Sequence, residues 1–187
     1  MLSQFQQVGR ALFTQRLVSA HSGNLSIRQG DRLVITHRGS GLGSITEADL
    51  VETGIVKNSR ATPLASSELA VHRAIYKSTS ALAIVHAHPP YAVALSFTDE
   101  EIVPCDIEGR SLLPRVLILG KEIMANAGEL GEEVAEALRQ YRVVLVKGHG
   151  TFAIGQLLEE AYYYTGVLEE SCRLLYLLRV LRVNSQD

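Results

Sequence analysis

Apolar residues recur at intervals of three and four positions at both ends of the chain. From Leu2 to Leu17 this spacing predicts an amphipathic helix that ends at Ser22-Gly23-Asn24. From Leu157 to Leu181 it predicts a long closing helix whose second half is apolar nearly all round. We expect that half to be buried, either within the fold or against another subunit.

Short apolar runs bounded by turn residues predict a set of strands between these helices. Residues 25–28 and 32–36 flank Gln29-Gly30-Asp31, which is typical of a hairpin. The remaining predicted strands lie at residues 50–56, 81–87, 116–119, 143–146 and 151–154.

Three further helical regions are predicted, over residues 68–77, 90–94 and 120–140. Ser66 or Ser67 is expected to cap the first of them. Pro90 suits the first turn of the second, and the third holds one or two helices broken near Gly128. Hairpins mixed with helices in this way indicate an α+β fold, in which helices cover a largely antiparallel sheet.

Length and composition narrow the class of protein. The 187 residues suit a single domain over residues 1–187. A formal charge of −2 with scattered basic residues argues against a nucleic-acid partner. No apolar stretch is long enough for a membrane span, and the N-terminus lacks the apolar core of a signal peptide. Only two cysteines occur, Cys105 and Cys172, in unrelated contexts, so we expect a cytoplasmic protein.

Three histidines are spaced as a metal site would require. His86 and His88 end a predicted strand, where side chains two positions apart point the same way. His149 follows a second apolar run, within Gly148-His149-Gly150. Three neutral imidazoles with an open fourth position are typical of catalytic zinc, and Mn²⁺, Co²⁺ or Fe²⁺ also suits imidazole. The alternative is that each histidine is an unrelated core or loop residue.

Small, donor-rich loops predict an anion site nearby. Ser66-Ser67-Glu68 stands at a predicted helix start, where unpaired N–H groups and the helix dipole favour negative charge. Ser22-Gly23-Asn24 and Arg38-Gly39-Ser40 are two similar loops. Each alone is most often a turn or a cap, so it is their coincidence that points to a site.

Taken in order, these residues resemble the class II aldolase and adducin family. The resemblance covers about residues 5–182 and rests on Gly23-Asn24-Leu25-Ser26, Ser66-Ser67-Glu68 with His72 after it, His86-x-His88 and Gly148-His149-Gly150. Residues 83–96 are similar to the fuculose-phosphate-aldolase branch. The resemblance implies a three-layer αβα fold around a mainly antiparallel sheet, and a cyclic homotetramer with active sites between subunits.

The resemblance also implies roles for individual residues. His86, His88 and His149 match the ligands of one zinc ion per subunit, and Glu68 matches the general acid/base. The substrate phosphate site is matched by Asn24, Gly39, Ser66 and Ser67. The implied reaction is the reversible cleavage of a ketose 1-phosphate, such as L-fuculose 1-phosphate, to dihydroxyacetone phosphate and an aldehyde.

Two departures from the family pattern affect the substrate. Arg38 replaces a small hydroxyl residue in the phosphate loop; it could hold phosphate bidentately, signal a carboxylate substrate, or point to solvent. The tyrosine that the aldolases contribute from a neighbouring subunit has no match in residues 105–109. Glu108 could take part of its role, or be a surface carboxylate.

Other functions within the family remain open from the sequence. A ribulose-phosphate 4-epimerase typically has Asp where Glu68 stands, and a methylthioribulose-phosphate dehydratase has a further catalytic carboxylate. An adducin-like binding domain would have lost metal ligands, whereas all three histidines are present here.

Overall fold

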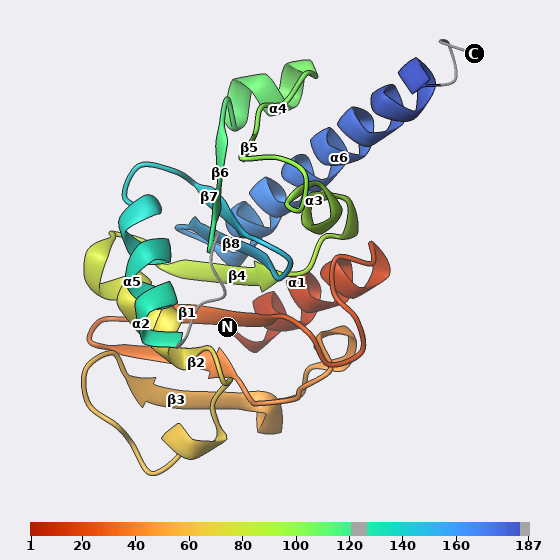
Figure 1. Cartoon of the computed structure of the whole chain (residues 1–187). Coiled ribbons are helices and arrows are strands. Elements are labelled where there is room, and N and C mark those ends of the chain that lie inside the picture. The colour runs from red at the N-terminus through yellow and green to blue at the C-terminus, as the bar shows by residue number, and fades with distance from the viewer. Residues whose placement is uncertain (121–126, 184–187) are drawn as a thin grey trace.

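The centre of the fold is one eight-stranded sheet (Figure 1). A computed structural model describes residues 1–120 and 127–183. Neighbouring strands are antiparallel except β6 and β7, which are parallel, so the expected mainly antiparallel sheet is confirmed. In spatial order the strands are β3 (Leu50–Gly54), β2 (Arg32–Thr36), β1 (Asn24–Gln29), β4 (Ala83–Ala87), β8 (Gly150–Gly155), β7 (Val143–Val146), β6 (Val116–Leu119) and β5 (Glu101–Ile102).

Helices cover both faces of this sheet, which confirms the three-layer αβα arrangement. On one face lie α1 (Leu2–Thr14), α3 (Pro90–Leu95) and α6 (Leu158–Val183). On the other lie α2 (Leu69–Ser78) and α5 (Ala127–Ala137). The short helix α4 (Ile107–Leu112) packs against α6. Three single 3₁₀ turns complete the described elements, at Leu42–Ser44, Glu47–Asp49 and Thr62–Leu64.

Strand β4 lies inside the sheet and contributes to both cores. All five of its residues are buried, and it pairs with β1 and with β8. Ala83, Val85 and Ala87 join the core under α1 and α6, whereas Ile84 joins the core under α2 and α5. His86 shares the orientation of Ile84, because alternate strand residues point to the same face. The strand therefore directs His86 toward the α2 side.

Several predicted helix ends are wrong. Helix α1 ends at Thr14 rather than near residue 22, since Arg16 adopts a left-handed φ of 59° that a helix cannot continue through. The N-cap residue of α2 is Glu68, not Ser66 or Ser67. Ser66 instead receives hydrogen bonds from the first turn, because its carbonyl accepts from the Leu69 N–H.

The segment between α3 and β6 holds two elements that the sequence did not predict, β5 and α4. The Asp106 side chain caps α4 by accepting a hydrogen bond from the Gly109 N–H at 2.7 Å. Helix α5 runs through Gly128, so the break predicted near that residue is absent from the described helix. The rest of that prediction, at residues 121–126, lies outside the described residues.

Helix α6 is buried in its first half only. Its buried residues run from Leu158 to Cys172. The second half extends away from the sheet (Figure 1), and most of its apolar side chains are exposed. The expectation that the fold itself buries that half is therefore wrong, and burial by another subunit stays a prediction. Among the described helices, none combines the length and the apolarity that crossing a membrane requires.

Candidate functional site

The three predicted metal ligands come together at one end of β4. His86 and His88 project to the same side, with their Nε2 atoms 2.8 Å apart. His149 joins them from the turn between β7 and β8, and the three ring centroids lie 4.8, 4.9 and 5.1 Å from one another. One nitrogen from each ring lies within 4.8 Å of the others. The alternative of three unrelated histidines is therefore excluded by their geometry.

His86 is held in one tautomer by the neighbouring strand. Its Nδ1 atom donates a hydrogen bond to the carbonyl oxygen of Thr151 on β8, at 2.9 Å, and its ring stacks on Phe152 with centroids 4.3 Å apart. Complete burial lowers the pKa of His86 to about 3. The ring is therefore neutral near pH 7, with the lone pair of Nε2 directed into the cluster. This arrangement is typical of a metal-binding histidine and its supporting carbonyl.

The glycines around His149 allow its loop to pass close to β4. Gly148 has a φ of +65°, which favours glycine, and its N–H donates to the Ser96 hydroxyl at 2.9 Å. A Cβ atom at Gly150 would clash with the Ala87 carbonyl oxygen. A side chain at Gly150 would therefore push the start of β8 away from β4, and one at Gly148 would strain the turn that carries His149.

Glu68 stands at the N-terminus of α2, and its side chain reaches the histidine cluster. Its carboxylate oxygens are 3.1 Å from Nε2 of His86 and 3.2 Å from Nε2 of His149, and one of them accepts a hydrogen bond from the Asn24 amide at 2.7 Å. Burial raises the pKa of Glu68, but the hydrogen bonds from His149 and from the Asn24 amide lower it, and the pKa of Glu68 lies below its usual range. The carboxylate is therefore ionised at neutral pH.

The nitrogen and oxygen atoms that face one another in the cluster fit a divalent cation. With Nδ1 of His86 donating to Thr151, its Nε2 is an acceptor, and its neighbours there are a carboxylate oxygen and Nε2 of His88. Acceptors that face each other need a proton or a cation between them. Two nitrogen ligands of a tetrahedral zinc ion are about 3.3 Å apart for bonds of about 2.0 Å. Here the Nε2 atoms of His86 and His88 are 2.8 Å apart, and the nitrogens of the three rings all lie within 4.8 Å of one another.

The predicted anion loops lie side by side near Glu68. An isolated β-bridge joins His37 to Ala65, and the Arg38 N–H donates to the Leu64 carbonyl at 3.0 Å. This pairing brings Arg38 and Gly39 next to the Ser66-Ser67 loop.

Side chains in these loops differ in exposure. Asn24 and Ser66 are buried, whereas Arg38, Gly39 and Ser67 are exposed. The Ser66 hydroxyl accepts from the Glu68 N–H at 3.3 Å, and the Gly39 carbonyl accepts from Nδ1 of His21 at 2.8 Å. The loops thus present backbone and hydroxyl groups beside the histidine cluster.

Residues that support the cluster were missed by the sequence analysis. Thr151, Phe152 and Ser96 contact the histidine rings or the loop that carries His149. Strand pairing places Phe152 opposite His86, and that register is not encoded locally. Glu108 is exposed on α4 and accepts a hydrogen bond from the Tyr163 hydroxyl at 2.6 Å.

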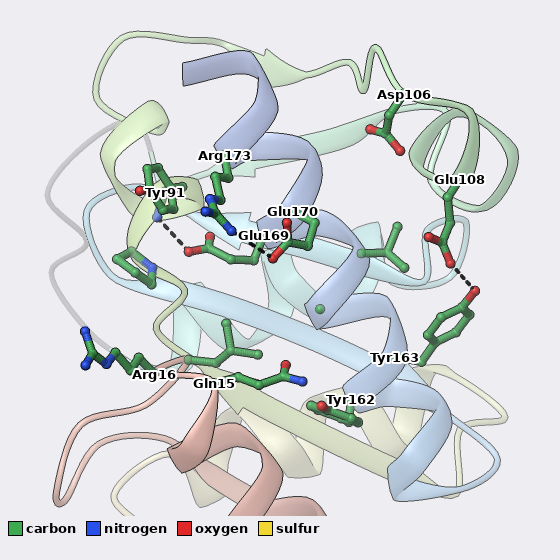
Figure 2. Close-up of a pocket in the computed structure, with 14 residues that line it drawn as sticks. Gln15, Arg16, Tyr91, Asp106, Glu108, Tyr162, Tyr163, Glu169, Glu170 and Arg173 are labelled. Carbon is green, nitrogen blue, oxygen red and sulfur yellow. Dashed lines mark hydrogen bonds and ion pairs between the residues drawn. The ribbon is translucent and has the colours of Figure 1, made fainter. Parts of the chain in front are cut away.

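A cavity of about 860 Å³ lies on the opposite face of the sheet, between α1, α3, α4 and α6 (Figure 2). Glu169, on α6, accepts hydrogen bonds there from the N–H groups of Tyr91 and Ala92. The residues described as lining it include neither Glu68 nor a histidine of the cluster. The cavity is therefore separate from the candidate metal site.

Comparison with known proteins agrees with the resemblance found in the sequence. Residues 3–176 match the family described as Class II Aldolase and Adducin N-terminal domain. An L-fuculose phosphate aldolase of Methanocaldococcus jannaschii is 32% identical over 176 residues, covering 93% of this chain and 94% of that protein. The crystal structure of L-fuculose-1-phosphate aldolase from Thermus thermophilus is 40% identical, with a TM-score of 0.90 and coverage of 97% and 95%.

Other matched relatives carry the names of a dehydratase and of a decarboxylase, each 28% identical to this chain. The family therefore includes more than one reaction. The match over nearly the whole chain and the shared fold give the same answer: the chain belongs to the class II aldolase and adducin family.

Proposed function

We propose that this chain is a zinc-dependent sugar-phosphate aldolase. It would reversibly cleave a ketose 1-phosphate similar to L-fuculose 1-phosphate into dihydroxyacetone phosphate and an aldehyde. The observation that carries the proposal is the placement of the Glu68 carboxylate within 3.2 Å of Nε2 of both His86 and His149. The names of the similar proteins support the same reaction.

Zinc would be held by His86, His88 and His149, and when bound it supplies Lewis acidity toward the carbonyl and hydroxyl oxygens of a hydroxyketone. The chain's own contribution begins with Glu68. In the condensation direction an ionised Glu68 oxygen removes a proton from the carbon that forms the new bond. In the cleavage direction the carboxyl group returns that proton to the same carbon.

The phosphate of the substrate would be bound by the three adjoining loops. Asn24, Arg38, Gly39, Ser66 and Ser67 offer amide, guanidinium, backbone and hydroxyl donors. Backbone N–H groups at the start of α2 add the favourable end of a helix dipole. Because Arg38 is exposed and permanently charged, it is free to turn toward a phosphate dianion.

The proposed assembly is a cytoplasmic homotetramer with active sites at subunit interfaces. The exposed apolar half of α6 supports it, since exposed apolar surface of this kind commonly marks a protein–protein contact. A residue from a neighbouring subunit would then complete the substrate site.

The test is cleavage of L-fuculose 1-phosphate by the zinc-loaded protein, with dihydroxyacetone phosphate measured by a coupled NADH-consuming reductase. Glu68→Gln should lower kcat by about a hundredfold or more and leave zinc content near that of the wild type. His88→Ala should lower zinc content itself, measured by elemental analysis. A chelator should abolish the activity of the wild type.

The results can also contradict the proposal. Loss of zinc in Glu68→Gln would make Glu68 a structural ligand, and unchanged zinc in His88→Ala would refute the metal site. Epimerisation, dehydration or decarboxylation of a sugar phosphate, with no dihydroxyacetone phosphate released, would favour an epimerase, dehydratase or decarboxylase instead. Products of those three reactions are distinguishable by mass and by chromatography of the sugar phosphates.

A further inference from the structure

Side-chain hydrogen bonds join one face of α2 to one face of β1. The Asn24 amide donates to Glu68 at 2.7 Å. Two residues along the strand, the Ser26 hydroxyl lies 2.7 Å from Nδ1 of His72 and 2.7 Å from the Tyr76 hydroxyl. The contacting helix residues are thus four positions apart, and the contacting strand residues are two apart.

These spacings match in length. Two strand residues advance about 6.6 Å, and four helix residues advance about 6.0 Å on one face. The Asn24–Glu68 contact and the Ser26–His72 contact can therefore form together only when the helix lies at one position along the strand. A shift of α2 along β1 would break both contacts.

His72 is the buried member of this pairing. Its side chain is fully buried, and among the described residues its Nε2 atom has no hydrogen-bond partner. Its contact with Ser26 is therefore what holds the polar side of the ring in place. The ring also meets Phe152 edge to face, with centroids 6.1 Å apart, and Phe152 in turn stacks on His86.

We propose that His72 is a positioning residue that holds the Glu68 carboxylate in place through the alignment of α2 on β1. The backbone provides the link, because the His72 N–H donates to the Glu68 carbonyl one turn earlier in α2. Ser26 is the residue of β1 that His72 contacts in this alignment. The consequence for catalysis rests on the proposed function, whereas the alignment itself does not.

The alignment is tested in the zinc-free protein by hydrogen exchange of the Asn24 side-chain amide, followed by NMR. His72→Phe keeps the ring, removes the hydrogen bond to Ser26 and replaces the unpartnered Nε2, so we expect a folded protein. His72→Asn keeps a polar atom at the position of Nδ1 and loses the ring. We expect Asn24 exchange to accelerate in His72→Phe and Ser26→Ala, and to remain near the wild-type rate in His72→Asn.

Kinetics of the zinc-loaded protein test the consequence for Glu68. A carboxylate displaced by about 1 Å costs up to about a hundredfold in rate. We therefore expect kcat for L-fuculose 1-phosphate to fall by about tenfold or more in His72→Phe and Ser26→Ala, with KM and zinc content little changed. His72→Asn should recover most of kcat. Thr165→Val removes a buried hydroxyl that, among the described residues, donates its hydrogen bond to the Ala161 carbonyl within α6. It is the matched control and should behave as wild type.

Either arm can overturn the inference. Wild-type Asn24 exchange and kcat in both His72→Phe and Ser26→Ala would refute it. Equal losses of stability and zinc in the Phe and Asn variants, with kcat per zinc-loaded chain unchanged, would leave His72 a packing residue only. If the wild type cleaves no sugar phosphate, the proposed function fails, and Asn24 exchange still decides the alignment.

Discussion

The two ring nitrogens of His86 have different hydrogen-bonding roles. Nδ1 donates to the Thr151 carbonyl, which leaves Nε2 as the acceptor that faces Glu68 and His88. A buried carbonyl thereby selects the ring tautomer that can bind a metal. The same residue is stacked on Phe152, so both its rotation and its protonation are determined by β8.

His72 gives the unfolding equilibrium a pH dependence. Burial lowers its pKa to about 4, from an ordinary value near 6.5. Between about pH 6.5 and pH 4 the unfolded chain binds a proton at His72 that the folded chain does not bind. The free energy of unfolding therefore keeps its full value above about pH 6.5 and falls as the pH drops toward 4. Over that window the loss is on the order of 3 kcal/mol.

The measurement is urea unfolding of the zinc-free protein at several values of pH. His86 and other groups also contribute, so the comparison is between the wild type and His72→Phe. The variant should lose less stability on acidification than the wild type. Parallel curves would show that His72 is not the buried neutral group described here.

At the scale of elements, Glu169 joins α6 to α3. Its carboxylate accepts from the Tyr91 N–H at 3.0 Å (Figure 2) and from the Ala92 N–H at 2.9 Å. These groups stand at the start of α3, which follows directly after His88 and Pro89. Burial raises the pKa of Glu169, and the two hydrogen bonds oppose that shift. The contact therefore secures the segment that carries one of the proposed metal ligands.

Removing this contact should destabilise the protein. Glu169→Ala leaves two N–H groups without their acceptor, and we expect a loss of about 2–4 kcal/mol in the free energy of unfolding. Glu170→Ala, which removes an exposed neighbour 3.7 Å from Arg173, should change it by less than about 0.5 kcal/mol. Chemical denaturation provides both values. Equal effects of the two substitutions would contradict the capping role of Glu169.

At the scale of the whole molecule, α6 carries surface that a single chain does not cover. Its second half exposes apolar side chains at intervals of three and four residues, at Leu174, Leu177, Leu178 and Leu181. Such a stripe is typical of a helix packed against another surface. The proposed homotetramer would bury it.

Charges introduced into this stripe should weaken the assembly. We expect the wild type to elute at four times the chain mass in size-exclusion chromatography with light scattering, and Leu177→Glu with Leu181→Glu to shift it toward smaller species. Val56→Glu alters another exposed apolar residue, which follows β3 and lies outside α6, and should leave the mass unchanged. A monomeric wild type would refute the proposed tetramer.

Local sequence determined much of this protein. Strand alternation already places His86 and His88 on one side, and glycine conformation already marks the loop of His149, since both depend on neighbouring residues alone. The predicted mixed fold with a mainly antiparallel sheet follows from similar local patterns. The sequence did not predict β5, which has two residues, or α4, which has six, because neither is long enough to show a periodic pattern.

Only the tertiary structure decided which distant groups meet. The contacts of Asn24 with Glu68 and of Thr151 with His86 join residues 44 and 65 positions apart, and they depend on the register of β1, β4 and β8. The exposure of the second half of α6 was equally undetermined, because an all-apolar helix face predicts burial without naming its partner. Periodicity reports what one segment prefers, whereas the alignment of segments depends on the packing of the whole chain.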